Sequence, residues 1–516
     1  MSNSNLEAAW RYHNGTKHSY QSIRSNPHHL DWRNQPLLFK VYSTLDATPL
    51  PRQVPQTGAA ALSAISTIPG ELESAAVPDM NALALLLQFS AGVTKEKRLP
   101  GGETFFFRAA ACTGALYEFE LYLVCGDLPG LDAGVYHFGV KDFSLRRLRQ
   151  GDWRGVLADA TGGAPSIVRA PLVIVCAGTY WRNAWKYQAR TYRHFGWDNG
   201  TIITNLLAMC AALRLPAEVV MGFVDEEVNR LLDLDTQREV TFSMVAVGQT
   251  PVRLPLPPGE VVQLGLETAP LSRKEVDYPV MREMHAASSL TSAEEVRAWR
   301  CKGPAKPLPA ASGHVIRLEP LGDLEIRLDS IEQVILRRGS TRQFAREPIT
   351  LEQLSTLLDR ATRGVPADFL DPAGAQLNDV YLIVNAVEGL SPGAYFFRRE
   401  ERSLELLKEG DFREQVAYLG LEQELPGDAS VAVFFLADLP PILERFGNRG
   451  YRATQLEAGI LGGKLYLAAY TQRLGATGLT FFDDDVTSFF LPHAAGKSAI
   501  FLTAVGKSAH RGHSAG

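Results

Sequence analysis

An internal repeat constrains this chain more than any other feature of its sequence. Residues 186–200 read KYQARTYRHFGWDNG, and residues 445–459, which lie 259 positions further on, read RFGNRGYRATQLEAG. The same offset aligns many identical residues across positions 122–215. A chain that repeats itself at this scale is a tandem duplication, so the differences between its two copies are informative.

Composition and charge exclude several classes of protein. The chain has 516 residues, of which 46% are hydrophobic and 21% charged, as in ordinary globular proteins. Its five cysteines are scattered and form no CxxC pair, which predicts a reducing compartment and no metal site. A net charge of -5 without a basic tract predicts no nucleic-acid partner. No secretory signal or membrane-length apolar run is visible, so we expect a soluble, cytoplasmic protein without membrane contact.

Proline-rich spacers predict where the copies are divided. The stretches at 250–260 and 302–313 break both helix and strand, and they enclose a helix that begins after Ser292. Strand-like runs mixed with helical segments predict the α+β class. The predicted domains are an irregular N-terminal arm, a first domain (copy one), a linker and a second domain (copy two), at residues 1–60, 61–250, 251–313 and 314–516.

Copy two contains a cluster of arginines and hydroxyls after a predicted helix. A capping box formed by Ser330 and Gln333 predicts where that helix begins, and RGSTR at 338–342 follows its end. Two guanidinium groups four residues apart, with hydroxyls between them, can bind a phosphate through paired hydrogen bonds. A charged helix end in solvent would have the same sequence, so both interpretations stay open at this point.

The sequence resembles the flavin-dependent nitroreductase superfamily, and within it the SagB/ThcOx-type dehydrogenases that oxidise azoline rings in ribosomal peptides. Arg338, Ser340 and Arg342 match the R-x-S-x-R/K motif, which in that superfamily holds the FMN phosphate and ribityl chain. Further similarity lies in YHNGTKHS at 12, TGALYEFELY at 113 and WKY at 185. The resemblance implies FMN as the cofactor and a nitroreductase fold duplicated as an intrachain pseudo-dimer.

Differences between the copies then predict one composite FMN site. In the superfamily the FMN lies at the interface of a homodimer and contacts both partners. Copy one lacks arginine at 66–70 but keeps a loop of small residues and the Lys186-Tyr187 pair, whereas copy two has Arg445-Phe446 there and a degenerate loop. We therefore expect one intact site and one eroded site. The other cofactor-binding residues that the resemblance implies are Arg108, Thr113, Gly114, Ala115, Leu116, Thr480, Phe481, Lys507 and Arg511.

The resemblance also implies a reaction and a substrate class. Lys186 and Tyr187 match the proposed base of azoline-oxidising relatives, which takes a proton from the ring while a hydride passes to flavin N5. A purely structural Lys-Tyr pair is the alternative. The expected substrate is a small molecule or a modified peptide, with partner proteins from a peptide-modifying system. An NAD(P)H-dependent nitro or quinone reductase and a flavin-poor scaffold subunit of a peptide-modifying complex are the alternative functions.

Two pairs of arginines occur at matching positions of the copies. Arg190 with Arg193, and Arg449 with Arg452, are predicted to be structural ion-pair partners. The acidic run at 483–485 is predicted to begin a helix, because negative charge is stabilised at a helix N-terminus.

Overall fold

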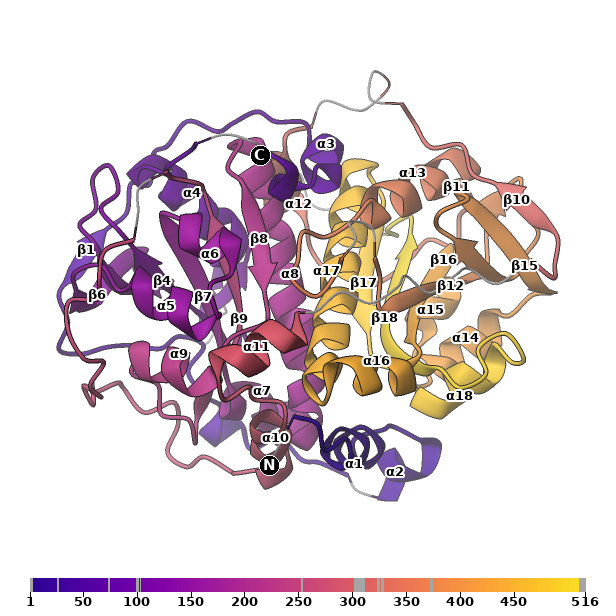
Figure 1. Cartoon of the computed structure of the whole chain (residues 1–516). Coiled ribbons are helices and arrows are strands. Elements are labelled where there is room, and N and C mark those ends of the chain that lie inside the picture. The colour runs from indigo at the N-terminus through magenta and orange to yellow at the C-terminus, as the bar shows by residue number, and fades with distance from the viewer. Residues whose placement is uncertain are drawn as a thin grey trace.

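The computed structural model describes residues 3–25, 27–72, 75–98, 102, 104–251, 254–300, 311–322, 325, 329–371 and 375–509. Two bodies lie side by side, copy one in indigo to magenta and copy two in orange to yellow (Figure 1). Each body has a mixed content of strands and helices, as the α+β prediction requires.

Each copy contributes an antiparallel sheet of seven strands in the described part of the chain, and the two strand orders correspond. The orders are β1-β6-β5-β4-β7-β9-β8 and β10-β15-β14-β12-β16-β18-β17. The first sheet comprises β1 (Ala47–Pro49), β4 (Phe119–Cys125), β5 (Gly134–Gly139), β6 (Ser144–Gln150), β7 (Leu172–Thr179), β8 (Ala217–Val220) and β9 (Glu239–Val247). The second comprises β10 (Val315–Arg317), β12 (Asn378–Val384), β14 (Gly393–Arg398), β15 (Ser403–Glu409), β16 (Val431–Ala437), β17 (Gly475–Leu479) and β18 (Ser498–Gly506). The shared order confirms the duplication.

The helices also occur in corresponding pairs. The pairs are α3 (Ala61–Ser66) with α12 (Ile331–Arg337), α4 (Met80–Ala91) with α13 (Leu351–Thr362), α5 (Arg154–Ala160) with α14 (Arg413–Leu419), α6 (Pro165–Arg169) with α15 (Glu424–Asp428), α7 (Tyr180–Tyr187) with α16 (Leu439–Phe446), α8 (Thr191–Ala212) with α17 (Arg449–Thr471), and α9 (Asp225–Leu231) with α18 (Asp483–Phe489). Smaller elements are the strand pairs β2 (Val93–Arg98) with β3 (Thr104–Arg108) and β11 (Ile349–Thr350) with β13 (Val387–Glu388), and the short turns η1 (Trp32–Asn34), η2 (Pro69–Glu71), η3 (Thr113–Ala115) and η4 (Gln188–Arg190). The predicted capping box at Ser330 is present, and Thr350 forms a second capping box at the start of α13.

Helices α8 and α17 cross at the centre of the molecule (Figure 1). Both are buried along nearly their whole length, as the apolar circumference of the first predicts. Gly200 meets Gly459 at the crossing, where a Cβ on Gly200 would lie 2.4 Å from the carbonyl carbon of Gly459. Glycine is required here because the two backbones approach too closely for any side chain. This crossing holds the copies together.

Reciprocal ion pairs also join the copies, and they confirm the prediction for the paired arginines. A buried aspartate at the start of α9 or α18 accepts from two arginines of the other copy. The pairs are Arg190–Asp483 at 2.9 Å, Arg193–Asp483 at 2.6 Å, Arg449–Asp225 at 2.6 Å and Arg452–Asp225 at 2.8 Å. The acidic run at 483–485 begins α18 as predicted.

The N-terminal arm differs from the expected irregular segment. It forms α1 (Glu7–Gly15) and α2 (Tyr20–Ser25), and β1 from the same segment pairs with β6 of copy one. Helix α1 lies on the side of copy two (Figure 1), where Asn3 donates to the carbonyl of Phe446 at 3.0 Å. Tyr12 is fully buried and donates to the carbonyl of Ala189 at 2.6 Å. The prediction was wrong because the apolar anchors of this helix are spaced among polar residues that face solvent.

The segment between the copies contains α10 (Pro279–Ala287) and α11 (Ala293–Trp299). Ser292 caps α11 by accepting from the backbone N–H of Glu295, as predicted. In the described part of the chain, no helix combines the length and the apolar character needed to cross a membrane.

Candidate active site

The arginine cluster of copy two meets copy one directly after α12. The Nε of Arg338 donates to the carbonyl of Ala109 at 3.0 Å, and its Nη2 donates to the carbonyl of Arg108 at 3.1 Å. The RGSTR segment and the small-residue loop therefore lie together at the interface between the copies. Arg338 donates two hydrogen bonds to the backbone of copy one. It therefore stabilises the interface between the copies in addition to any contact with a ligand.

The small-residue loop of copy one has an unusual backbone. Gly114, Ala115 and Tyr117 have φ values of 65°, 54° and 51°, a region that side-chain-bearing residues seldom adopt. Leu116 is buried between them. Such conformations persist only where surrounding contacts enforce them, and they are typical of ligand-binding loops.

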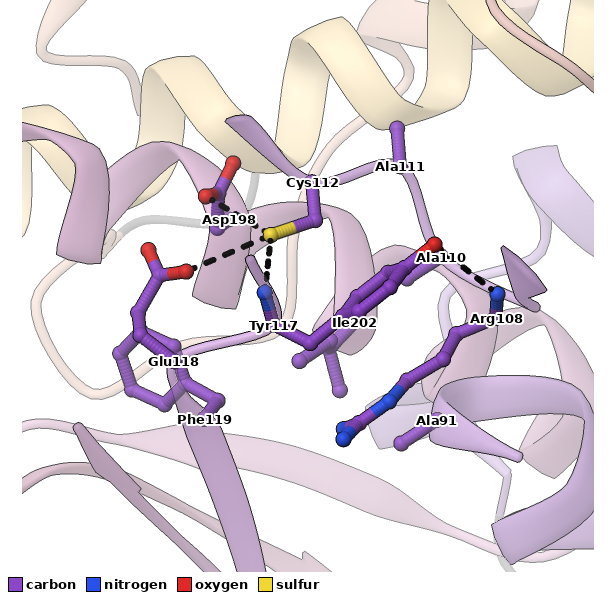
Figure 2. A pocket seen from close by; sticks show the side chains of 10 residues that line it. All are labelled: Ala91, Arg108, Ala110, Ala111, Cys112, Tyr117, Glu118, Phe119, Asp198 and Ile202. Atoms are coloured by element: carbon purple, nitrogen blue, oxygen red, sulfur yellow. Dashed lines mark hydrogen bonds between the residues drawn. The ribbon is translucent and has the colours of Figure 1, made fainter. Parts of the chain in front are cut away.

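Contacts to α8 hold the loop in this conformation. Thr113 donates to the carboxylate of Asp198 from its backbone N–H at 2.9 Å and from its hydroxyl at 2.8 Å. The backbone N–H of Tyr117 donates to the Sγ of Cys112 at 3.0 Å. Figure 2 shows that this sulfur also contacts the carboxyl groups of Asp198 and Glu118. The loop is thus tied at both of its ends to one buried polar cluster.

Lys186 and Tyr187 end α7 beside this loop. A Cβ on Gly114 would lie 2.9 Å from the hydroxyl oxygen of Tyr187, so glycine allows the tyrosine to pack on the loop. The Lys186 amine lies 5.3 Å from the centroid of the Tyr187 ring. The structure therefore brings the predicted catalytic pair together with the predicted cofactor loop.

Arg342 of copy two acts electrostatically on this pair of copy one. Burial lowers the pKa of Lys186, and the nearby Arg342 guanidinium lowers it further. Burial raises the pKa of Tyr187, and the carboxylate of Asp198 raises it further. In the described part of the chain, Lys186 and Arg342 make no ion pair with an acidic residue. Two neighbouring cations without an acidic partner can accept an anionic ligand.

The segment after β17 contributes a further polar group. The hydroxyl oxygen of Thr480 is buried and has no hydrogen-bond partner among the described residues, and Phe481 beside it is fully buried. Buried hydroxyls are normally hydrogen-bonded, so this hydroxyl is available to pair with a ligand. Ser340 lies 3.4 Å from the hydroxyl of Tyr466, which accepts from the backbone N–H of Gly478. Tyr466 connects the arginine cluster to β17, and the sequence analysis missed it.

The two predicted basic residues near the C-terminus have different outcomes. The backbone carbonyl of Lys507 accepts from the N–H of Ala345, which places the end of β18 close to the RGSTR segment. The amine of Lys507 lies 3.4 Å from Glu347 and is half exposed. Arg511 lies outside the described residues.

At the pseudo-symmetric position in the other half of the molecule, a side chain of the protein itself occupies the backbone donors. By strand register, Met221 occupies the position that Thr480 has in copy two, and Gly222 follows it. The carboxylate of Asp368 accepts from the N–H groups of Met221 at 2.8 Å and Gly222 at 2.9 Å. Arg300 lies over the same carboxylate at 3.9 Å. These backbone donors are thus already used by the protein.

Linker helix α11 also contacts this position. Trp299 donates from Nε1 to the carbonyl of Phe446 at 2.9 Å, and its ring lies 5.4 Å from the Phe446 ring. Phe446 is the counterpart of Tyr187, and it is 2% exposed. Copy one also has η2 where copy two has the RGSTR segment, and no arginine occurs there. The position beside the RGSTR segment and its pseudo-symmetric counterpart are therefore built from different residues.

Comparison with known proteins agrees with this architecture. Residues 335–507 match the Nitroreductase family. A nitroreductase-like protein of Methanocaldococcus jannaschii, MJ1384, is 27% identical over 182 residues, which are 32% of this chain and 89% of that protein. Trifolitoxin-processing protein TfxB of Rhizobium leguminosarum bv. trifolii is 25% identical over 265 residues, which are 47% of this chain and 71% of that protein.

A solved structure matches nearly the whole chain. The crystal structure of a nitroreductase-like protein from Anabaena variabilis superposes with a TM-score of 0.76 and 24% sequence identity, covering 97% of this chain and 99% of that chain. A match over this length includes both copies and the linker. It shows the fold that the two copies share.

Proposed function

We propose, from the premise that this chain is a tandem nitroreductase-fold protein, that it is an oxidoreductase which binds one FMN between its two copies. The observation that carries the proposal is the Arg342 guanidinium of copy two, which makes no ion pair with an acidic group among the described residues and acts on Lys186 of copy one across the interface. The unpaired hydroxyl of Thr480 lies on the adjoining segment predicted to contact the flavin. The residues present therefore fit an anionic ligand with hydrogen-bonding edges, as FMN is.

The chain's own residues divide the task of holding the cofactor. Arg342 and Ser340 offer donors for the phosphate and ribityl chain, and Thr480 offers a hydroxyl. The loop at 113–116 covers the site from copy one, and Arg338 fixes this loop relative to copy two. When bound, FMN accepts a hydride at N5 and so supplies the redox chemistry.

Lys186 is the proposed general base. Because burial and Arg342 lower its pKa, the amine loses its proton more readily than an ordinary lysine and can take one from the substrate at Nζ. Tyr187 is less suited, because burial and Asp198 raise its pKa and keep the phenol protonated. Tyr187 would instead orient the substrate through its hydroxyl.

The proposed substrate is an azoline ring or a similar group in a modified peptide. Similarity to the trifolitoxin-processing protein TfxB supports a peptide as the substrate class, and partner proteins of a peptide-modifying system would deliver it. Removal of a ring proton by Lys186, with hydride transfer from the neighbouring carbon, turns an azoline into an azole. We infer one active site per chain, because Asp368 and α11 close the pseudo-symmetric position.

The flavin content of the purified chain tests this proposal. One FMN per chain, released by denaturation and identified by chromatography, is the expected result. Arg338→Ala combined with Arg342→Ala should abolish retention, with circular dichroism to check that the fold is intact. Two FMN per chain would contradict the closure of the second position. A chain that takes up no added FMN would contradict the proposal and favour a scaffold role.

An NAD(P)H-dependent nitro or quinone reductase is the second candidate, favoured by the similarity to the nitroreductase-like protein MJ1384. Stopped-flow absorbance distinguishes the two. Rapid flavin reduction by NAD(P)H would favour the reductase, and reduction by an azoline peptide, with the azole found by mass spectrometry, would favour the dehydrogenase.

A further inference from the structure

Three acidic groups meet in the interior below the cofactor loop. The Sγ of Cys112 lies 3.3 Å from an oxygen of both Glu118 and Asp198, and dashed lines mark both contacts in Figure 2. Glu118 is fully buried and Asp198 is 5% exposed. We call these three residues the acid cluster.

The contacts within the acid cluster require protons. Asp198 accepts from the N–H and the hydroxyl of Thr113, which favours its ionised form. The Cys112 thiol has one hydrogen, so it cannot donate to both carboxylates at once. Two ionised carboxylates this close in a buried place would repel each other strongly. One of them must therefore carry a proton, and it is Glu118, because Thr113 donates two hydrogen bonds that favour the ionised form of Asp198.

The surroundings of Glu118 offer no compensating charge. The titratable and charged groups that face the acid cluster are Tyr187 from α7, Tyr117 of the loop, Arg108 from the end of β3 and Arg338 of copy two. Arg338 donates to the carbonyls of Arg108 and Ala109 and not to a carboxylate of the cluster. The guanidinium of Arg108 donates to the carbonyl of Leu38, and among the described residues it makes no hydrogen bond to either carboxylate of the cluster. One oxygen of Glu118 has no hydrogen-bond partner among the described residues. Burial and the charge of Asp198 accordingly raise the pKa of Glu118 well above its usual range.

We propose that the acid cluster positions the loop at 113–117 over the cofactor, and that it does so only while Glu118 is protonated. This inference rests on the proposed FMN site. The loop needs such support because Ala115 and Tyr117 adopt left-handed conformations, and the bonds from Thr113 to Asp198 and from Tyr117 to Cys112 enforce them. Glu118, Cys112 and Asp198 are positioning residues, since they act on the cofactor through the loop.

The direction of the pH effect follows from linkage. In the closed loop the pKa of Glu118 is raised, and in an open, hydrated loop it returns toward that of an ordinary glutamate. The closed loop is therefore fully stable below the open-state pKa and loses stability as pH rises toward the closed-state pKa. Over that window, FMN affinity should fall up to about tenfold per pH unit.

Glu118→Gln separates this mechanism from simple packing. Glutamine has the same shape and mimics the protonated acid, so the variant should hold FMN at alkaline pH, where the wild-type chain releases it. FMN dissociation constants are measured by fluorescence between about pH 6 and about pH 9. Each value is divided by that of Glu294→Gln, an exposed control on α11, which cancels the titration of FMN itself.

A second readout does not depend on FMN. Hydrogen exchange at the amides of residues 113–118 in the flavin-free chain, corrected for intrinsic rates, should lose protection with rising pH in the wild type but not in Glu118→Gln. Equal pH dependence in the two chains would overturn the proposal. So would a stoichiometric divalent metal that Cys112→Ser removes, because a cation would then balance the acid cluster. Failure to bind FMN at any pH would count against the proposed function, and the exchange data would still decide the role of Glu118.

Discussion

At the residue scale, the candidate site depends on side chains whose pKa values change when the two copies bring them together. Lys186 is an ordinary lysine in the sequence, and its lowered pKa comes from burial in copy one and from Arg342 in copy two. The counterpart of Lys186 is Arg445, a side chain that cannot give up its proton in a protein. The copies have therefore diverged at a position where only one of them could supply a base.

Lys186→Ala should keep FMN and lose turnover by about 10²- to 10⁴-fold, the usual contribution of a general base. Steady-state kinetics and the flavin absorbance of the same preparation provide the check. Arg445→Ala is the matched control and should leave turnover unchanged. Normal turnover by Lys186→Ala would show that another group takes the proton.

Arg342→Ala should shift the pH profile of the reaction. Since Arg342 lowers the pKa of Lys186, its removal raises that pKa, and the rising limb of kcat/KM should move to higher pH. The measurement is kcat/KM against pH at saturating FMN, so that weaker cofactor binding does not distort it. If the rising limb of the kcat/KM profile does not move, Arg342 does not influence the pKa of the catalytic base.

At the element scale, the crossing of α8 and α17 is the main rigid feature that positions the site. Asp198 lies on α8 and Tyr466 lies on α17, so the geometry of the site depends on how closely the two helices approach. Glycines at the crossing make this approach possible, because a Cβ on Gly459 would lie 2.6 Å from the carbonyl oxygen of Gly196. Overpacking at this point would displace both halves of the site.

Gly200→Ala should destabilise the chain by about 3 kcal/mol or more, because the new methyl group would meet the backbone of α17. Thermal unfolding followed by circular dichroism measures the change in Tm. Gly259→Ala is the control, since a Cβ there meets nothing within 4 Å, and its effect should stay within about 0.5 kcal/mol. Equal Tm values for the two variants would mean that α8 and α17 can move apart without any loss of stability.

At the scale of the whole molecule, the chain is a pseudo-dimer joined by reciprocal buried ion pairs. Asp483 of copy two binds two arginines of copy one, and Asp225 of copy one binds two arginines of copy two. Burial alone would raise the pKa of Asp483, but Arg190 and Arg193 outweigh this and lower it to about 2. Removal of either aspartate would leave two buried cations unpaired.

Asp483→Asn should cost about 3 to 5 kcal/mol at neutral pH. A carboxyl whose pKa is lowered on folding stabilises the fold above its unfolded pKa, and this contribution is lost as pH falls toward about 2. Urea unfolding between about pH 5 and about pH 2.5 should therefore show a smaller loss of stability in the variant than in the wild type. The same slope in both chains would contradict the role of this ion pair. Asp484→Asn, at an exposed neighbouring position, is the control.

Much of the fold could be predicted from the sequence because many of its elements follow from local sequence patterns. The 259-residue repeat, the capping box at Ser330 and the acidic run at 483–485 all predicted features that the structure contains. The N-terminal arm could not be predicted in this way, because α1 is held by contacts with residues more than 170 positions away. Asp198 offered one signal that was overlooked, since Glu457 occupies its matching position and is also acidic.

The sequence by itself determined that the chain is a duplication and which copy carries each set of candidate residues, because identity and spacing are properties of the linear chain. Only the tertiary structure decided how these sets combine. It brought Arg342 to Lys186, assembled the acid cluster under the loop, and placed Asp368 on the backbone donors of Met221 and Gly222. The physical reason is that these contacts join segments far apart in sequence, and their strength comes from burial, which no local pattern records.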